Sequence, residues 1–488
     1  MTLFQKTFIE LCASFGSAPF LDDDRVGVFS IEESYQISLR AAKDLQDAGF
    51  QSGDGIIVKA SRDASTTLLF YATQILGLIA LTIDPRQDAE ALLKLDPRLK
   101  GIIYQDDPND VCHWVIKAGE KECQMVVPSK YEGGFIEPEY RKDADAVWVL
   151  TSGSEGHFKV VRHCQEDLFS HCRRYHGPSS CHEYDRGIML LPLYHVFGLA
   201  LIYIPLVVGF SLYFPTSLDL DEIIDYTIKK KITYLDTVPS FHYVLAKRVQ
   251  ERGIHFTTLR NGLTAGAPME ESRFKEIEET LGMKLLPVYG ASEIIGISGL
   301  GEEGSQERRR TTVGPLVPGT ELRIVDDNGN ILDAGQQGEI VVRSPSLMLG
   351  YLGEDSGIDE EGFFATGDIG YLDEIGDLHI TGRKKQIIIR NGNNISASEV
   401  ENRLLKIKGI EYCCVVGVPD SLAGEVPAAA IVKKEGTPAS IIEEEIEKEL
   451  PKNLWPGHIL YLDALPALGS GKTDRVKVKE MLLEKIKG

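Results

Sequence analysis

Apolar and polar positions along the first hundred residues repeat with two periods, one helical and one extended. In residues 34–48 the apolar positions recur every three or four residues, which predicts an amphipathic helix. Residues 56–60 and 78–83 are short apolar runs typical of buried strands, and residues 63–77 between them are long enough for a helix. This strand–helix–strand order predicts a parallel sheet covered by helices.

The same order returns as far as residue 235, with predicted strands at 146–151, 188–191 and 232–235 and a predicted helix at 220–231. The longest apolar run, from Gly198 to Pro215, contains Pro205 and Gly209. We interpret it as a buried helix that leads into a strand, and we expect no transmembrane segment. The fold class is therefore α/β, with a large N-terminal domain of layered sheets.

Between about residues 313 and 380 the pattern changes to short alternating stretches separated by Gly and Asp turns, which predicts a small β-barrel-like subdomain. A further α+β unit of about 100 residues follows, a size typical of a separate domain. Its predicted elements are strands near 386–390, 412–417 and 427–433 and helices at 398–407 and 439–450. We place the boundary at Gly382–Lys385, which gives domains 1–382 and 383–488.

Charge narrows the range of partners. The 488 residues carry a net charge of −21, and an acidic surface argues against nucleic acid and anionic membranes. An anionic substrate therefore needs a local cationic site. We expect the short basic runs to be solvated surface: Arg173-Arg174, Lys229–Lys231 and Arg308–Arg310.

The eight cysteines are too few for a disulfide framework in a chain of this length, and the N-terminus lacks the basic start and apolar core of a signal peptide. We therefore expect reduced thiols and a cytoplasmic protein. Histidines and cysteines between His163 and His182 include zinc-type ligands, but they contain no CxxC pair. Because residues 164–175 are predicted to form a helix that would scatter these side chains, we favour a role without metal.

The first candidate site follows the predicted strand at 146–151 and consists of Thr151, Ser152, Gly153, Ser154, Glu155, Gly156 and Lys159. Small hydroxyl residues and two glycines let backbone N–H groups approach a polyphosphate, and Lys159 adds a mobile positive charge. The spacing differs from GxxxxGK[ST], so this is not a nucleotide-kinase loop. Taken alone, the segment is equally compatible with an ordinary turn.

Further motifs follow in order: LPLYHVFGL at 191–199, TAGAP at 264–268, YGASE at 289–293, TGD at 366–368, Gly382-Arg383, and GSGKTDR at 469–475. Together with the phosphate loop they resemble the adenylate-forming superfamily of acyl- and aryl-CoA synthetases, carrier-protein ligases, adenylation domains and luciferases. The resemblance extends from about Tyr35 to Arg475. It implies an ATP-dependent enzyme that activates a carboxylic acid as an acyl-adenylate, releases pyrophosphate and passes the acyl group to a thiol.

The resemblance also implies a role for each motif residue. Lys472, on a Gly-Ser-Gly loop, would bridge the carboxylate and the α-phosphate, where positive charge must oppose two meeting anions. Glu293 would hold Mg²⁺ through a carboxylate oxygen, and Ser292 keeps a hydroxyl for the α-phosphate. The other residues would enclose the nucleoside: Tyr289 and the backbone at Gly266, Ala267 and Pro268 for adenine, and Asp368 and Arg383 for the ribose hydroxyls.

For the acid, the resemblance implies a pocket at His195 and Gly290. No Asp stands between Leu191 and Leu199, where amino-acid-activating relatives hold the α-ammonium, so we expect an acid without an α-amino group. Gly290 leaves room for an aryl ring or acyl chain where relatives for the smallest acids carry Trp. Lys385 corresponds to the hinge of a rotating small domain, and Gly392 to the tunnel for the thiol.

Several positions depart from the family pattern. In the phosphate loop Glu155, Phe158 and Val160 replace Thr or Ser, Pro and Gly, and Ile389 replaces a frequent lysine near the hinge. The thiol acceptor therefore stays open between CoA and the phosphopantetheine of a carrier protein. A catalytically silent acyl- or adenylate-binding protein is a third alternative. The ligands implied are ATP, Mg²⁺ and a small-molecule carboxylic acid.

Overall fold

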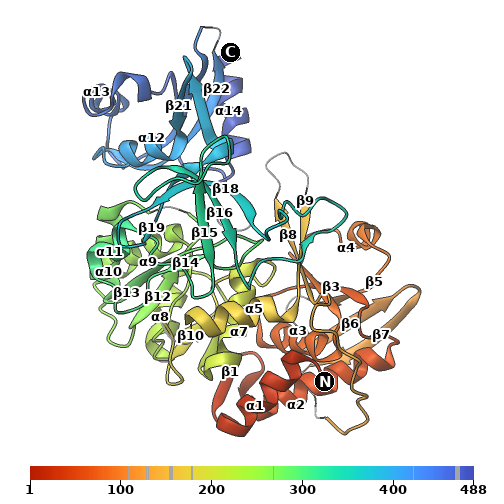
Figure 1. The fold of residues 1–488 in the computed structure, drawn as a ribbon. Coiled ribbons are helices and arrows are strands. Elements are labelled where there is room, and N and C mark those ends of the chain that lie inside the picture. The colour runs from red at the N-terminus through yellow and green to blue at the C-terminus, as the bar shows by residue number, and fades with distance from the viewer. Residues whose placement is uncertain are drawn as a thin grey trace.

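The computed structural model describes residues 1–107, 110–127, 129, 131–152, 158–176, 180–267, 269–420, 422–467 and 473–487, with the side chains of all but 152 and 487. Figure 1 shows a large body that contains the first three quarters of the chain and a smaller C-terminal unit, in blue, that stands on it.

The largest sheet has eight strands in the order β17-β9-β8-β4-β3-β5-β6-β7. Its centre is parallel: β3 (Gly55–Lys59) lies between β4 (Ile79–Ile83) and β5 (Leu99–Gln105), and β4 also pairs with β8 (Val147–Ser152). The buried helix α3 (Ala64–Leu76) connects β3 to β4, as the apolar pattern predicts. Antiparallel strands extend both edges: β6 (His113–Ala118), β7 (Lys121–Val126), β9 (Phe158–His163) and β17 (Gly350–Tyr351).

Two smaller sheets also lie in the large body. One contains β10 (Arg186–Ile188), β11 (Ser211–Phe214), β1 (Pro19–Asp23) and β2 (Gly27–Ser30), and the other contains β12 (Asn261–Thr264), β13 (Lys284–Tyr289) and β14 (Ser298–Gly299). Tyr234 joins them through single bridges to Gly187 and Asn261. The segment at 232–235, predicted as a strand, forms only these single bridges at Tyr234 and no continuous ladder.

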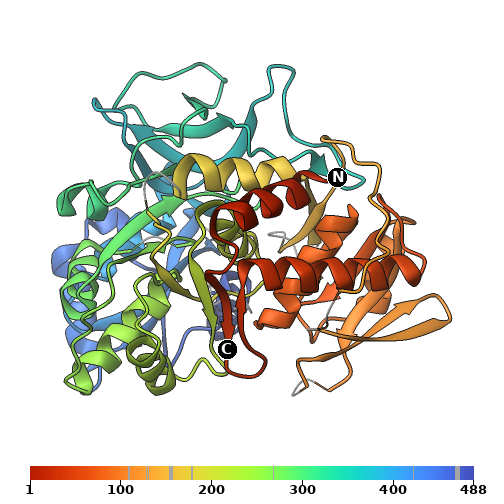
Figure 2. The same ribbon diagram turned by 90° about the horizontal axis from the view of Figure 1, so that it is seen from below.

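Helices surround these sheets: α1 (Leu3–Phe15), α2 (Ile31–Asp47), α4 (Ala89–Leu92), α5 (Gln165–His171), α7 (Val196–Val208), α8 (Leu220–Lys229), α9 (Pro239–Glu251), α10 (Glu271–Leu281) and α11 (Gln306–Thr311). Figure 2 shows α1 and α2 side by side in red; both contact α3, and α1 also contacts α5 and α7. The apolar run at 198–215 is α7 followed by β11, with Gly209 ending the helix at φ 89°, which confirms the helix–strand interpretation. No helix within the described ranges is both long and apolar enough to cross a membrane.

The β-rich segment is an antiparallel sheet of β15 (Glu321–Val325), β16 (Gly338–Arg343), β18 (Phe364–Leu372) and β19 (Leu378–Arg383). Beyond it, a separate sheet contains β20 (Ile387–Arg390), β21 (Asn393–Ser396), β22 (Ile410–Asp420), β23 (Gly424–Lys433) and β24 (His458–Leu462), with helices α12 (Ala397–Leu404), α13 (Ala439–Glu449) and α14 (Arg475–Lys487). The small unit contacts the large body through Tyr412, whose ring lies 6.1 Å from that of Tyr243 and 5.2 Å from the guanidinium of Arg273.

Candidate active site

The first part of the site is a contact between three side chains far apart in the sequence, Tyr289, Asp368 and Arg383. Asp368 and Arg383 are paired across β18 and β19, and Nε of Arg383 lies 3.0 Å from Oδ1 of Asp368. The Tyr289 hydroxyl donates to Oδ2 of Asp368 at 2.6 Å. Burial and the Asp368 charge raise the pKa of Tyr289 well above its usual range, so this hydroxyl stays protonated. The sequence singled out these three residues for the nucleoside, and the structure brings them together.

The backbone just before Asp368 lies within β18, where the pairing of β18 with β16 shifts register. Gly367 has φ 73°, in the left-handed region that favours glycine, and the backbone N–H of Asp368 donates to Oγ1 of Thr366 at 3.1 Å. Thr366 in turn donates to the carbonyl of Ile340 at 2.8 Å, which anchors this part of β18 on the neighbouring strand β16.

Glu293 lies in the loop between β13 and β14, and its Oε1 accepts a hydrogen bond of 2.8 Å from the hydroxyl of Tyr351. The loop is strained, because Ile295, a β-branched residue, has φ 61°. A Cβ on Gly290 would lie 2.1 Å from the carbonyl oxygen of Ile295, so the loop itself requires glycine here. This backbone geometry is sufficient to explain glycine at 290, and its role in the acid pocket stays a prediction.

The phosphate loop is only partly described. Gly153, Ser154, Glu155 and Gly156 lie outside the described residues, as does the side chain of Ser152. Thr151 and Lys159 face each other in the β8–β9 pair at the base of the loop. Nζ of Lys159 lies 2.9 Å from Oε2 of Glu354 and 4.4 Å from the centre of the Tyr351 ring.

Residues 346–354, here called the strap, join Glu293 to the phosphate-loop strand. Backbone bonds run from Met348 to the carbonyl of Glu293 (2.8 Å) and from Leu352 to the carbonyl of Val160 (2.9 Å), and β17 pairs with β9. No local spacing in the sequence indicates Tyr351 and Glu354, because their positions come from long-range strand pairing.

The LPLYHVFG motif forms the entry to α7. His195 is the N-cap residue of this helix, and a Cβ on Gly198 would lie 2.1 Å from the carbonyl of Pro192, so the turn requires glycine. The hydroxyl of Tyr194 is hydrogen-bonded to Asp84, at the end of β4. His195 therefore lies where α7 meets the carboxyl edge of the large sheet.

His163, weighed above as a zinc ligand, holds the site loop instead. Its Nε2 lies 2.7 Å from the carbonyl oxygen of Ser292, and its Nδ1 lies 3.2 Å from Oδ2 of Asp167. In the part of the chain that the structure describes, no three His, Cys, Asp or Glu side chains form a group able to hold a metal ion. A bound nucleotide would supply the oxygens that a Mg²⁺ at Glu293 needs besides the carboxylate.

The other candidate residues lie on loops. Gly266, with φ 91°, and Ala267 are exposed directly after β12, whereas Pro268 and Lys472 lie outside the described residues. The residues flanking the Lys472 segment, Ala467 and Thr473, form an antiparallel bridge.

Lys385 lies in a short 3₁₀ turn (Lys384–Gln386) between β19 and β20. Asn391 and Gly392, with φ 50° and 75°, are the two turn residues of the β20–β21 hairpin. The hairpin explains glycine at 392, and the tunnel role stays a prediction.

Comparison with known proteins identifies relatives along most of the chain. The profile of the AMP-binding enzyme family matches residues 10–352, and that of the AMP-binding enzyme C-terminal domain matches residues 399–472. A 2-succinylbenzoate–CoA ligase of Geobacillus sp. (strain WCH70) is 26% identical over 478 residues, 95% of this chain and 96% of that protein. ATP-bound MatB from Rhodopseudomonas palustris has the same fold, with a TM-score of 0.84, 23% identity and 99% of each chain covered.

Some curated relatives are longer than the region they share with this chain. The medium-chain fatty-acid–CoA ligase of Escherichia coli (strain K12) is 30% identical over 353 residues, which are 70% of this chain and 62% of that protein. Naringenin synthase of Pestalotiopsis fici is 33% identical over 473 residues, 90% of this chain but 17% of that protein. The chain thus spans less than two thirds of the length of these two relatives.

Proposed function

The chain belongs to the AMP-binding enzyme family, and we propose that it is an AMP-forming ligase that joins a carboxylic acid to the thiol of CoA. The observation that carries the proposal is the position of Asp368, whose two oxygens are bonded to Tyr289 and Arg383. A carboxylate flanked by a phenol and a guanidinium at a strand pair is suited to accept hydrogen bonds from both ribose hydroxyls. The named acyl- and aryl-CoA ligases among the relatives support CoA as the acceptor.

In this proposal ATP is the first substrate. Asp368 and Arg383 hold the ribose, Tyr289 and the backbone at Gly266, Ala267 and Pro268 hold adenine, and Thr151–Gly156 with Lys159 hold the phosphates. Glu293, oriented by Tyr351, contributes a carboxylate oxygen to Mg²⁺, which when bound neutralises phosphate charge. Ser292 places its hydroxyl at the α-phosphate.

Two half-reactions follow. A carboxylate oxygen of the acid attacks the α-phosphorus, the bond from that phosphorus to the bridging oxygen breaks, and pyrophosphate leaves with the electron pair. Lys472 offsets the negative charge of the two meeting anions. In the second step the thiolate sulfur attacks the acyl carbon, the carbon–oxygen bond to phosphate breaks, AMP leaves, and the thiol proton passes to solvent.

The two steps would use one site in turn. We propose that residues 383–488 rotate about Lys385 relative to residues 1–382, which removes Lys472 and brings the hairpin at Gly392 to the thiol path. The separate five-stranded sheet supports this division, as do two apolar clusters whose buried residues all lie beyond residue 387. His195 and Gly290 line the acid pocket, and the acid lacks an α-amino group. We place this activity in the cytoplasm.

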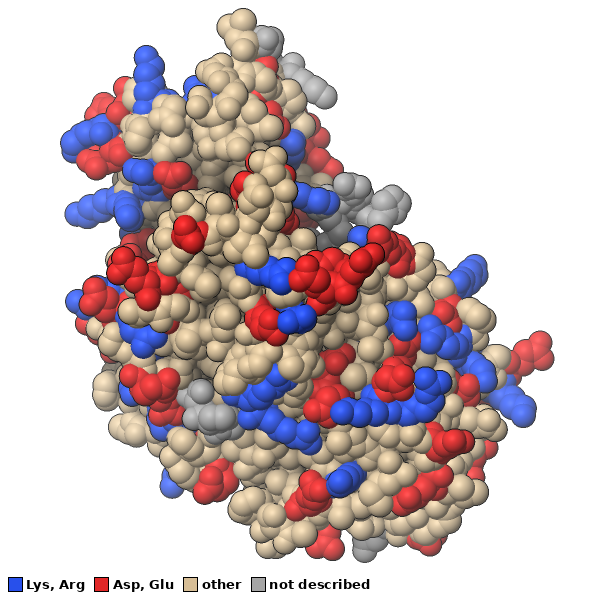
Figure 3. All heavy atoms as spheres, viewed as in Figure 1, with Lys and Arg blue, Asp and Glu red and all other residues tan. Residues whose placement is uncertain are grey.

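Loading of a carrier protein is the alternative for the second step. Such a partner needs a basic docking surface, and side chains of both arginine runs, at 173–174 and at 308–310, are engaged within the chain. Arg309 is buried against Glu278 at 2.9 Å, and Arg308 pairs with Asp377 at 2.6 Å. The expectation that residues 308–310 are solvated surface is wrong for Arg309. On the face shown in Figure 3, Lys and Arg are interspersed with Asp and Glu.

A screen of acid-dependent ATP–pyrophosphate exchange over aryl, short, medium and long acids tests the first step. We expect exchange with at least one acid lacking an α-amino group. Thioester formation from that acid is then compared with CoA and with a holo carrier protein. Exchange with none of the acids would contradict adenylation and favour a silent binding protein, whereas a thioester on the carrier alone would exclude CoA.

A further inference from the structure

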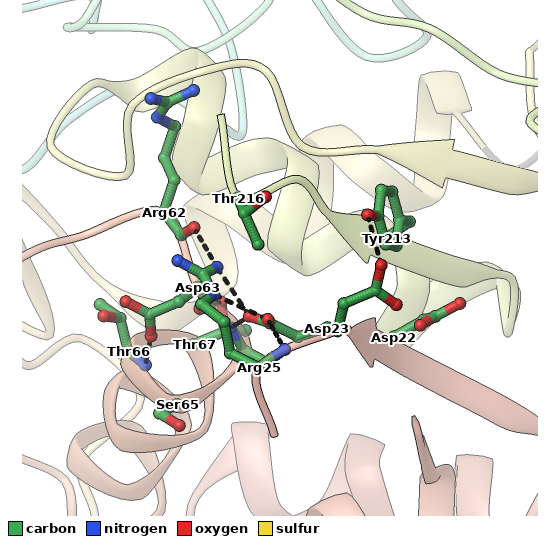
Figure 4. A network of polar contacts seen from close by, with 12 residues as sticks. Asp22, Asp23, Arg25, Arg62, Asp63, Ser65, Thr66, Thr67, Tyr213 and Thr216 are labelled. Carbon is green, nitrogen blue, oxygen red and sulfur yellow. Dashed lines mark hydrogen bonds and ion pairs between the residues drawn. The ribbon is translucent and has the colours of Figure 1, made fainter. Parts of the chain in front are cut away.

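Arg62 follows β3 and directly precedes Asp63, the N-cap residue of α3. In the part of the chain that the structure describes, its guanidinium makes no hydrogen bond and no ion pair, and the enclosed Nη1 atom has no partner. Only its carbonyl oxygen is engaged, by Nη2 of Arg25 at 3.1 Å. Figure 4 shows the guanidinium extending away from Asp23, Arg25 and Asp63.

The carboxylates nearby are already used. Asp23 pairs with Arg25 at 2.8 Å and also accepts from the backbone of Ala64 at 3.0 Å. Asp63 caps α3 by accepting from the backbone of Thr66 at 2.6 Å, and its other oxygen accepts from Gln105 at 3.3 Å. Burial, together with the charge of Arg25, lowers the pKa of Arg62, whereas Tyr194 opposes this shift. Arg62 therefore presents positive charge that the surrounding carboxylates do not neutralise.

The position of Arg62 in the sheet relates it to the active site. The strands β8, β4 and β3 are neighbours and parallel, so their carboxyl ends lie at one edge, where α/β sheets bind ligands. The end of β8 leads into the phosphate loop, and Arg62 follows β3, two strands or about 10 Å along this edge. Between them, Asp84 at the end of β4 is bonded to Tyr194, the neighbour of His195.

We propose that Arg62 binds a phosphate group of the thiol acceptor, the nucleotide part of CoA or the phosphate of phosphopantetheine. This inference rests on the proposed ligase function. In the proposed reaction the phosphate loop and Lys159 bind the polyphosphate of ATP, and the carboxylate of the acid reacts at the α-phosphate. The anionic groups that still need a cationic partner are therefore the phosphates of the thiol acceptor. A guanidinium matches a phosphate with two parallel hydrogen bonds, and a protein of net charge −21 needs such a local cation for an anionic acceptor.

The test is Arg62→Gln, with Arg62→Lys as the variant that keeps a charge. In Arg62→Gln we expect KM for CoA to rise about tenfold, because one charge-assisted hydrogen bond to the phosphate is lost. KM for pantetheine, which has no phosphate, and the rate of ATP–pyrophosphate exchange should not change. Arg62→Lys should lie between wild type and Arg62→Gln. The control is Arg141→Gln, which removes an arginine 77% exposed and paired with Asp143. Dephospho-CoA identifies which phosphate of CoA is held.

Three results would overturn the proposal. An unchanged KM for CoA would remove Arg62 from the acceptor site, and an equal rise for pantetheine would indicate general damage. A raised KM for the acid in the exchange reaction would assign the anion to a second carboxylate of the substrate. If the wild type catalyses no exchange, the ligase function fails by itself. In that case calorimetric titration of wild type and Arg62→Gln with CoA and pantetheine still tests the proposal. Equal affinities of the two proteins for CoA would contradict it.

Discussion

The hydroxyl of Tyr351 lies 2.8 Å from Oε1 of Glu293, although 58 residues separate the two. The ring of the same tyrosine lies 4.4 Å from Nζ of Lys159. One side chain thus contacts the carboxylate that we assign to magnesium and the lysine that we assign to polyphosphate. The strap holds it there by pairing with β9, so the two halves of the phosphate site are positioned by one short strand.

The Tyr351→Phe variant keeps the ring beside Lys159 and removes the hydroxyl that orients Glu293. We expect the Mg²⁺ concentration for half-maximal exchange to rise about fivefold, the equivalent of one hydrogen bond of about 1 kcal/mol. Tyr461→Phe is a matched control, since its hydroxyl also donates to a glutamate, Glu443 at 3.2 Å, in the small unit. The same Mg²⁺ dependence in both variants would contradict the role of Tyr351.

In Asp368→Ala, Tyr289 and Arg383 lose their shared acceptor, and the ribose loses its carboxylate. We expect ATP affinity, measured by calorimetric titration, to fall about 100-fold, as for two charge-assisted hydrogen bonds. Asp373→Ala removes a carboxylate next to the same sheet that accepts from the backbone of Asp377 and lies 3.1 Å from Nε2 of His379. That control should lower stability and leave ATP affinity unchanged. Wild-type affinity in Asp368→Ala would exclude the ribose assignment.

The β–α–β layers were predictable because apolar runs and helical periodicity are local properties of the chain. The partners Tyr289, Asp368 and Arg383 were predictable from motif order, although no local rule places them in contact. The Tyr351–Glu293 contact was not predictable, since it depends on pairing between β17 and β9. Tight backbone geometry requires glycine at 290 and hairpin geometry favours it at 392, so the functional roles of these two glycines stay predictions.

Stability should depend on pH through Asp236, which is buried and accepts a hydrogen bond of 2.6 Å from the backbone of Leu263. Burial raises its pKa from 3.8 to about 8. Between these values unfolding releases a proton, so its contribution to stability is complete below about pH 4 and is lost as pH rises to about 8, by up to about 1.4 kcal/mol per pH unit. Asp236→Asn removes this loss. The free energy of unfolding of the variant minus that of wild type should therefore increase from pH 5 to pH 8, and a constant difference would contradict this account.

The buried ion pair between Arg309 and Glu278 should be structural. Removing one partner leaves a charge enclosed, so Arg309→Ala should lower the free energy of unfolding by about 3 kcal/mol in denaturant titration. Arg310→Ala, whose partner Glu271 is 60% exposed at 3.8 Å, should cost less than about 1 kcal/mol. Equal small losses in both variants would show that the Arg309–Glu278 pair contributes no more to stability than an exposed ion pair.

We propose that one site performs two half-reactions because the domain that carries Lys472 moves between them. The direct measurement is Lys472→Ala, assayed separately for acid-dependent ATP–pyrophosphate exchange and for thioester formation from a supplied acyl-adenylate and CoA. We expect exchange to be abolished while thioester formation from the adenylate continues near the wild-type rate. Equal loss of both half-reactions would exclude a domain rotation that separates them.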